Sequence, residues 1–241
     1  MHAKKERSKP IVAIDGPAGS GKTTVSRLVA QRLGYVVLDT GALYRTLALA
    51  TSRAGLTAAS PELGAFCGEL VARGAIVLEP SSAGGARVLL DGEDVSQQIR
   101  TPEMSSRASE VSAIPAVRAA LLELQRKIGE GGGVVVEGRD IGSVVFPDAE
   151  AKFFLTASIE RRAERRFAEL GATADAPTLD AVLQQVVQRD RRDSERAIAP
   201  LIQARDAALM DSTHLPIDQV VDRIVDAVRR IEADLASASG S

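Results

Sequence analysis

The sequence predicts an α/β fold in which a parallel five-stranded sheet is flanked by helices. Short, wholly apolar segments, such as "PIVAI" at 10–14 and "VVV" at 134–136, are typical of strands that are covered on both faces. Segments with helical periodicity alternate with these strands, which favours parallel pairing through right-handed crossovers. The first strand runs into a glycine-rich loop and then a helix. Ligands of such sheets bind beyond the carboxyl ends of the strands.

The first part of the chain predicts a strand at Pro10–Asp15 and, after the glycine-rich loop, a helix at Lys22–Leu33. In that helix the apolar residues recur at helical spacing and form one inner face. A short strand at Tyr35–Leu38 and a helix at Leu43–Arg53 follow. This part of the core is therefore expected to span residues 10–54.

The pattern of apolar segments and turn signals changes between residues 55 and 100. Two apolar segments, at 75–80 and 86–91, are expected to be strands separated by a loop at 81–85. The pair Asp91–Gly92 is a hairpin-turn signal. We expect residues 55–100 to form a small antiparallel insertion.

The remaining core is expected at 101–156 and 197–235. Thr101 and Pro102 are a good helix start, and a second helix is expected from Pro115 to the glycine run at 131–133. Strands are predicted within 134–140, 151–156 and 207–212, and an amphipathic helix after Pro216. Two charged helices, expected from Ser158 and from Thr178, form a lid region at 157–196. The tail at 236–241 is expected to be disordered.

The composition excludes several classes of protein. The 241 residues carry a net charge of −2, so no overall field attracts a nucleic acid polymer. The one cysteine excludes an internal disulfide and a multi-cysteine zinc site, and the two histidines argue against a histidine metal cluster. No apolar run approaches the roughly 20 residues that span a bilayer, and the basic amino terminus has no apolar segment behind it. We expect a cytoplasmic protein without membrane contact, and a monomer.

The glycine-rich loop matches the phosphate-binding pattern G-x-x-x-x-G-K-[ST] of P-loop NTPases. Its backbone N–H groups and the positive end of the next helix can bind phosphates. We expect Lys22 to reach the β- and γ-phosphates and the Thr23 hydroxyl to bind Mg²⁺. The expected ATP-binding residues are Gly16, Pro17, Ala18, Gly19, Ser20, Gly21, Lys22, Thr23 and Thr24. The chain contains no asparagine, so the N-K-x-D base reader of guanine-specific switches is absent.

The arginines of the two charged helices are the next candidates. Helical spacing places Arg161, Arg162 and Arg165 on one face of the first helix. In the second helix, Val182, Leu183, Val186 and Val187 are the expected buried stripe, and Arg189, Asp193 and Arg196 share one side. Solvated helices with surface ion pairs are the alternative. Because phosphoryl transfer develops charge that an arginine can neutralise, we interpret the helices as a catalytic lid. The expected catalytic residues are Lys22, Arg162, Arg165 and Arg189.

Two further loops follow strands. "LDTGALYR" contains Thr40 and Arg45, and "VEGRDIG" contains Arg139 and Asp140. The arginines are placed to hold an anionic acceptor, while the hydroxyl and the carboxylate can contact a base or a sugar. Loop capping is the alternative for Asp39, at the start of the first loop, and for Asp140. Taken alone, Arg118 is interpreted as a surface charge.

These motifs together resemble bacterial cytidylate kinases. The resemblance covers about residues 14–212 and includes "IDGPAGSGKTT", "LDTGALYR", "LDGEDVSQQIRT", "VVVEGRDIGSVVFPDA" and "RDRRDSERAIAPL". It implies Mg²⁺-dependent transfer of the ATP γ-phosphoryl group to CMP or dCMP. The substrate-binding residues that it implies are Thr40, Tyr44, Arg45, Arg118, Arg139, Asp140, Asp193 and Arg196, with Arg189 near the transferring phosphate. Glu137 stands where some members have aspartate.

Two other functions remain open from the sequence. A nucleotide-binding switch or sensor would use the P-loop without an acceptor. A kinase of another small metabolite would also use it, but would leave the cytidylate-like loops unexplained.

Overall fold

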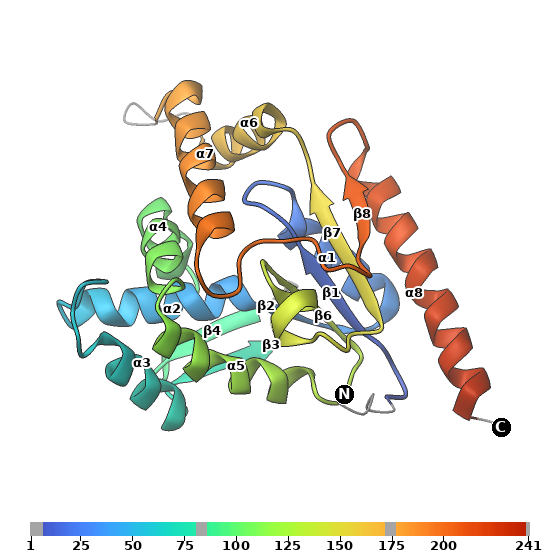
Figure 1. Cartoon of the computed structure of the whole chain (residues 1–241), viewed down its shortest axis with the longest axis horizontal. Helices are drawn as coiled ribbons and strands as arrows, with labels where there is room; N and C mark the ends of the chain where they lie inside the picture. The colour runs from blue at the N-terminus through green and yellow to red at the C-terminus, as the bar shows by residue number, and fades with distance from the viewer. Residues whose placement is uncertain (1–6, 81–85, 172–176, 240–241) are drawn as a thin grey trace.

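The computed structural model describes residues 7–80, 86–171 and 177–239. Its main sheet has five parallel strands in the order β2-β6-β1-β7-β8. The strands are β1 (Ile11–Asp15), β2 (Val36–Asp39), β6 (Val134–Gly138), β7 (Ala151–Thr156) and β8 (Ala208–Asp211). The predicted fold class is confirmed (Figure 1).

Helices cover both faces of the sheet, which explains why the central strands are wholly apolar. Val12 and Ile14 of β1 pack toward α1 (Lys22–Leu33) and α8 (Ile217–Ser239). Ile11 and Ala13 pack into the opposite cluster, with α2 (Thr40–Arg53) and α5 (Pro115–Gly129). Successive side chains of a strand point to opposite faces, so a strand between two helical layers needs apolar residues at every position.

The predicted antiparallel insertion is confirmed as β3 (Ile76–Pro80), β4 (Ala86–Leu90) and β5 (Glu93–Asp94). Asp91 and Gly92 join β4 to β5 with φ angles of 50° and 82°, as the predicted hairpin turn requires. The predicted loop at 81–85 lies outside the described residues. The insertion also contains a helix that was not predicted, α3 (Leu63–Ala72), and a short helical turn, η1 (Gln98–Arg100).

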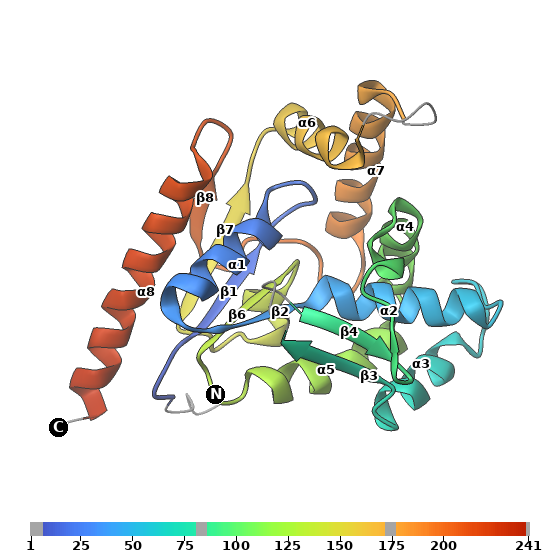
Figure 2. The same ribbon diagram turned by 180° about the vertical axis from the view of Figure 1, so that it is seen from behind.

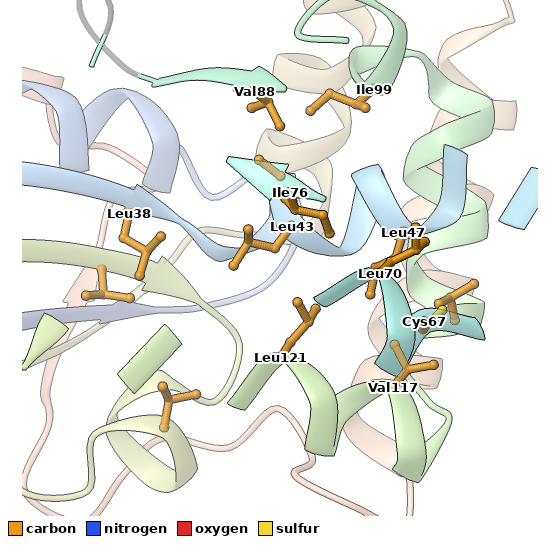
Figure 3. Packing of buried hydrophobic residues seen from close by; sticks show 14 of the residues in the cluster. Leu38, Leu43, Leu47, Cys67, Leu70, Ile76, Val88, Ile99, Val117 and Leu121 are labelled. Carbon is orange, nitrogen blue, oxygen red and sulfur yellow. The ribbon is translucent and has the colours of Figure 1, made fainter. Parts of the chain in front are cut away.

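A single apolar cluster joins the insertion to the core. Figure 3 shows side chains from α2, α3, α5 and the small sheet converging. The labelled members are Leu38, Leu43, Leu47, Cys67, Leu70, Ile76, Val88, Ile99, Val117 and Leu121. The insertion is therefore packed against the core over a shared interior.

The predicted helix starts of the second half are confirmed. Thr101 accepts a hydrogen bond from the Met104 amide at the start of α4 (Pro102–Val111). Ser158 and Thr178 likewise cap α6 (Ile159–Leu170) and α7 (Leu179–Glu195). Figures 1 and 2 both place α6 and α7 at the end of the molecule opposite α3 and α5.

The apolar side chains of the lid helices, α6 and α7, are more exposed to solvent than predicted. Val187 was expected in the buried stripe of α7 but is 41% exposed, and Phe167 of α6 is 38% exposed. Each lid helix packs mainly against the other and lies away from the main sheet, so part of its apolar stripe faces solvent (Figure 2).

The predicted disorder of the tail is wrong for residues 236–239. Helix α8 continues to Ser239, and the Ser237 hydroxyl donates to the Ala233 carbonyl. The segment is rich in alanine, which has the highest helix propensity. Residues 240–241 lie outside the described part. Within that part, no helix is both long and apolar enough to cross a membrane.

Candidate active site

A cavity of about 380 Å³ opens at the carboxyl ends of β1, β2 and β6. The P-loop forms one wall, and α2, α4 and α5 contribute to the opposite side. The lid contributes Arg166 and Glu169 of α6 and Arg189 and Asp193 of α7. Segments that are far apart in the sequence thus meet at the sheet edge where a ligand was expected.

The P-loop conformation depends on glycine at defined positions. Gly16 has a φ of 150°, and a Cβ there would lie 2.0 Å from the Leu155 carbonyl oxygen. Gly19 has a φ of 75°, and a Cβ there would meet the backbone oxygen of Arg162 at 2.8 Å. The loop is therefore packed against both β7 and the lid. Of the nine predicted ATP-binding residues, Ala18, Gly19, Gly21, Lys22, Thr23 and Thr24 line the cavity, whereas Gly16, Pro17 and Ser20 are not among its lining residues.

Lys22 is buried at the floor of the cavity. Its Nζ donates to the Pro17 carbonyl at 2.7 Å and lies 3.4 Å from Ser20 Oγ. Burial lowers the pKa of the Lys22 ammonium well below its usual value, and the nearby Arg139 guanidinium lowers it further. Bound phosphate would oppose both effects, because its negative charge favours the ammonium form.

Glu137 lies beside Lys22 and Thr23 and was not among the predicted site residues. Its Oε2 accepts a hydrogen bond from the Thr23 hydroxyl at 3.0 Å, while its buried Oε1 has no hydrogen-bond partner among the described residues. Burial raises the pKa of Glu137 to about 7, and the neighbouring Asp39 carboxylate adds to the increase. Its place at the end of β6 was visible in the sequence, but its contact with Thr23 was not.

The raised pKa of Glu137 predicts how stability should vary with pH. As pH rises from about 4.5 to about 7, the unfolded chain loses this proton while the folded protein keeps it. The free energy of unfolding therefore falls as the pH rises through that window. Glu137→Gln removes the ionisation, so we expect it to raise the melting temperature at pH 8 and to have little effect at pH 4. Thermal unfolding in metal-free buffer measures the difference.

Glu93 is the matched control for that measurement. Arg53 lowers the pKa of Glu93 to about 2, so the ionised form stabilises the folded protein above pH 4.5. Glu93→Gln should therefore lower the melting temperature slightly at pH 8. Equal shifts in the two variants, or a lower melting temperature for Glu137→Gln at pH 8, would contradict the account.

All eight predicted substrate-binding residues line the cavity. Around its far end, Asp140 accepts hydrogen bonds from Arg118 and, at 3.3 Å, from Arg196. The Arg118 guanidinium also lies 5.7 Å from the centre of the Tyr44 ring. The interpretation of Arg118 as a surface charge is wrong, because the helix that carries it faces the cavity and only 8% of the residue is exposed.

Nearer the P-loop, two ion pairs hold arginines at the cavity wall. Arg139 donates to Asp193 at 2.8 Å, and Arg45 donates to Asp39 at 2.7 Å. Ser109, which was not predicted, lies 3.3 Å from Asp193. The Thr40 hydroxyl donates to the Glu137 backbone oxygen at 2.7 Å. The cavity thus has an excess of guanidinium groups that suits an anionic ligand.

The arginines of α6 and α7 that were predicted to be catalytic do not all line the cavity. Arg189 lines the cavity, and burial together with the nearby Arg139 guanidinium lowers its pKa to about 9. Arg162 and Arg165, predicted as catalytic, are absent from the described cavity lining. They donate instead to the P-loop carbonyls of Ala18 and Ser20, each at 3.1 Å. Both point at the P-loop because α6 packs directly on Gly19.

The positions of Arg161 and Arg166 in α6 also differ from the prediction. Arg161 pairs with Glu164 at the surface and does not share a face with Arg162, so that part of the predicted face is wrong. Arg166, which was not predicted, lines the cavity. Helical spacing gives the relative positions of these residues, but only the packing of α6 decides which of them faces the ligand.

Known proteins resemble this chain over most of its length. The sequence model of the family described as "Cytidylate kinase" matches residues 12–230. The chain is 51% identical over 213 residues to "Cytidylate kinase" from Geobacter sp. (strain M21), covering 88% of this chain and 89% of that protein. It is 52% identical over 219 residues to "Cytidylate kinase" from Syntrophotalea carbinolica, covering 90% and 91%. A solved structure of an uncharacterized protein from Eubacterium ventriosum has a TM-score of 0.51 at 13% identity, over 92% of this chain and 99% of that one, which shows the fold alone.

Proposed function

The chain belongs to the cytidylate kinase family, and we infer from this that it is a CMP kinase that transfers the γ-phosphoryl group of ATP to CMP or dCMP. The observation that carries the inference is the single cavity in which the P-loop, the acceptor-side arginines and the lid arginines meet. A protein that only bound ATP would need the P-loop but not the acceptor-side arginines.

We propose that ATP places its triphosphate along the P-loop, where Lys22 turns from the Pro17 carbonyl toward the β- and γ-phosphates. Arg45 and Arg139 leave their carboxylate partners to hold the acceptor phosphate. Arg118, Asp140 and Arg196 line the part of the cavity that suits the cytosine base, with Thr40 and Tyr44 beside them. Asp193, between Ser109 and Arg139, suits the pentose.

In the reaction, an oxygen of the acceptor phosphate forms a bond to the γ-phosphorus. The bond from that phosphorus to the bridging oxygen of ADP breaks in line. No general base is needed, because the attacking phosphate is already an anion. Lys22, Arg166 and Arg189 neutralise the charge that develops on the transferred group. Closure of α6 and α7 over the two nucleotides excludes water as a competing acceptor.

The residues present fit Mg²⁺. Thr23 and Glu137 offer a hydroxyl and a buried carboxylate, which are hard oxygen ligands, and one oxygen of Glu137 lacks a hydrogen-bond partner among the described residues. The described residues contain no group of three or more acidic, histidine or cysteine side chains for a metal. Mg²⁺ at a phosphate site needs only one or two protein ligands. When bound, it supplies positive charge to the β- and γ-phosphate oxygens.

Arg162 and Arg165 have a structural role in this proposal. By binding the carbonyls of Ala18 and Ser20, they hold those oxygens away from the cavity. The N–H groups of the loop are then free to face the triphosphate. This replaces the expectation that both arginines touch the transferred phosphoryl group.

The experiment that tests the function measures ADP release from ATP with and without CMP. A CMP kinase releases ADP at a rate that depends on CMP, with one CDP formed per ADP. A switch or sensor would hydrolyse ATP slowly at a rate that CMP does not change. ADP release that is independent of CMP would contradict the proposed function.

A further inference from the structure

Asp15 is a buried carboxylate that lies outside the cavity lining. It ends β1 immediately before Gly16 and is 4% exposed. Its Oδ1 accepts a hydrogen bond from the Ile141 amide at 2.8 Å, and its Oδ2 accepts one from the Gly142 amide at 2.7 Å. Burial raises the pKa of Asp15 to about 6, and the two amides oppose this increase because they donate to the ionised form.

The two amides open the helical turn η2 (Ile141–Val145), which directly follows Arg139 and Asp140. The first amides of a helical turn have no partner within the turn and need an acceptor. Asp140 occupies the position from which a side chain would cap the turn, but it makes no capping hydrogen bond. Its carboxylate is used instead by Arg118 and Arg196 in the cavity.

Asp15 therefore caps a turn that begins more than a hundred residues later, and leaves Asp140 free for the cavity. The approach is close: a Cβ on Gly142 would lie 3.4 Å from Asp15 Oδ2 and 3.1 Å from the Lys152 side chain. Asp15 also pairs in the sheet with Gly138, the residue before Arg139. The end of β1 therefore contacts the chain on both sides of the Arg139–Asp140 segment. It pairs with Gly138 on one side and accepts hydrogen bonds from Ile141 and Gly142 on the other.

We propose that Asp15 is a positioning residue of the acceptor site, which sets the backbone that carries Arg139 and Asp140. The proposal rests on the proposed function for the identity of the acceptor. It predicts that Asp15, although it adjoins the P-loop in sequence, acts mainly on the binding of the nucleoside monophosphate.

The test compares Asp15→Asn with the wild-type protein. Asparagine keeps the size of the side chain, but its NH₂ group would face one of the two backbone N–H groups, so one hydrogen bond is lost and the turn is displaced. We expect the KM for CMP to rise about tenfold. We expect the Kd of a non-hydrolysable ATP analogue, measured by calorimetry, to stay within twofold.

Glu150→Gln is the matched control. Glu150 Oε2 accepts a hydrogen bond from the Ile11 amide at 2.9 Å, at the other end of the same strand. A role in strand stability alone would make the two variants alike. We expect Glu150→Gln to lower the melting temperature and to leave the KM for CMP within twofold of the wild-type value.

Three results would overturn the proposal. They are an unchanged KM for CMP in Asp15→Asn, equal changes in CMP and ATP-analogue affinity, and a KM for CMP in Glu150→Gln that rises as much as in Asp15→Asn. If Asp15→Asn does not fold, Asp15→Ser is the second variant. Its hydroxyl ends about one bond short of both amides, so we expect the same selective rise in the KM for CMP; no rise would overturn the proposal. Failure of the proposed function is distinguishable, because it would appear in the wild-type protein itself.

Discussion

Replacing Lys22 by methionine should lower kcat for the phosphorylation of CMP by about a thousandfold, since loss of one preorganised electrostatic donor costs about 10²–10³ in rate. The Lys22 ammonium is buried at the cavity floor, within reach of the space that the triphosphate would occupy. Methionine keeps the apolar stem and removes only the charge and the donors. Steady-state kinetics with ATP and CMP gives the change.

Lys152→Met is the matched control for Lys22→Met. Lys152 is 8% exposed against 7% for Lys22, and its Nζ also donates to a backbone carbonyl, that of Pro147, at 2.7 Å. Its other partner is Asp206, away from the cavity. We expect Lys152→Met to lower the melting temperature and to leave kcat within about threefold. A kcat for Lys22→Met within tenfold of the wild-type value would contradict the assigned role.

Replacing Arg189 by methionine should also lower kcat strongly, by about 10²–10³. In related reactions an arginine that neutralises the transferred phosphoryl group raises kcat by about 10³–10⁵. We expect a smaller loss here because Arg166 also lines the cavity and can neutralise part of the charge. The pKa of Arg189, lowered to about 9, still leaves the guanidinium charged at pH 7.5. The loss should appear mainly in kcat, because the charge that Arg189 meets develops in the transition state.

Arg191 provides the comparison within the same helix. Its side chain is 75% exposed and pairs with Glu195 at 3.0 Å, outside the cavity. Arg191→Met should leave kcat and both KM values within twofold. If Arg189→Met and Arg191→Met behave alike, the cavity-facing side of α7 has been assigned wrongly.

Most of the fold could be predicted because local signals agreed with the tertiary structure. The apolar strands, the threonine and serine caps and the Asp91–Gly92 turn each have a local physical cause. Helix α3 was missed, although Leu63, Cys67 and Leu70, its buried residues, recur at helical spacing. The strand signals that follow it led to an all-antiparallel interpretation of the insertion.

The candidate site was predictable to the extent that it depends on strand ends. Thr40, Arg139 and Asp140 follow parallel strands, and the sheet brings them together. The orientation of the lid arginines depends on how α6 meets Gly19, which no local pattern encodes. The contacts of Glu137 with Thr23 and of Asp15 with Ile141 join residues more than a hundred positions apart, so they appear only in the folded chain.

The most direct test of the central claim, that one cavity joins ATP to a cytidine monophosphate, is the ADP-release assay run over a panel of acceptors. The panel contains CMP, dCMP, UMP, AMP and shikimate, each with ATP and Mg²⁺. We expect the highest kcat/KM for CMP or dCMP and no measurable transfer to shikimate. Equal rates with all the nucleotides, or transfer to none of them, would contradict it.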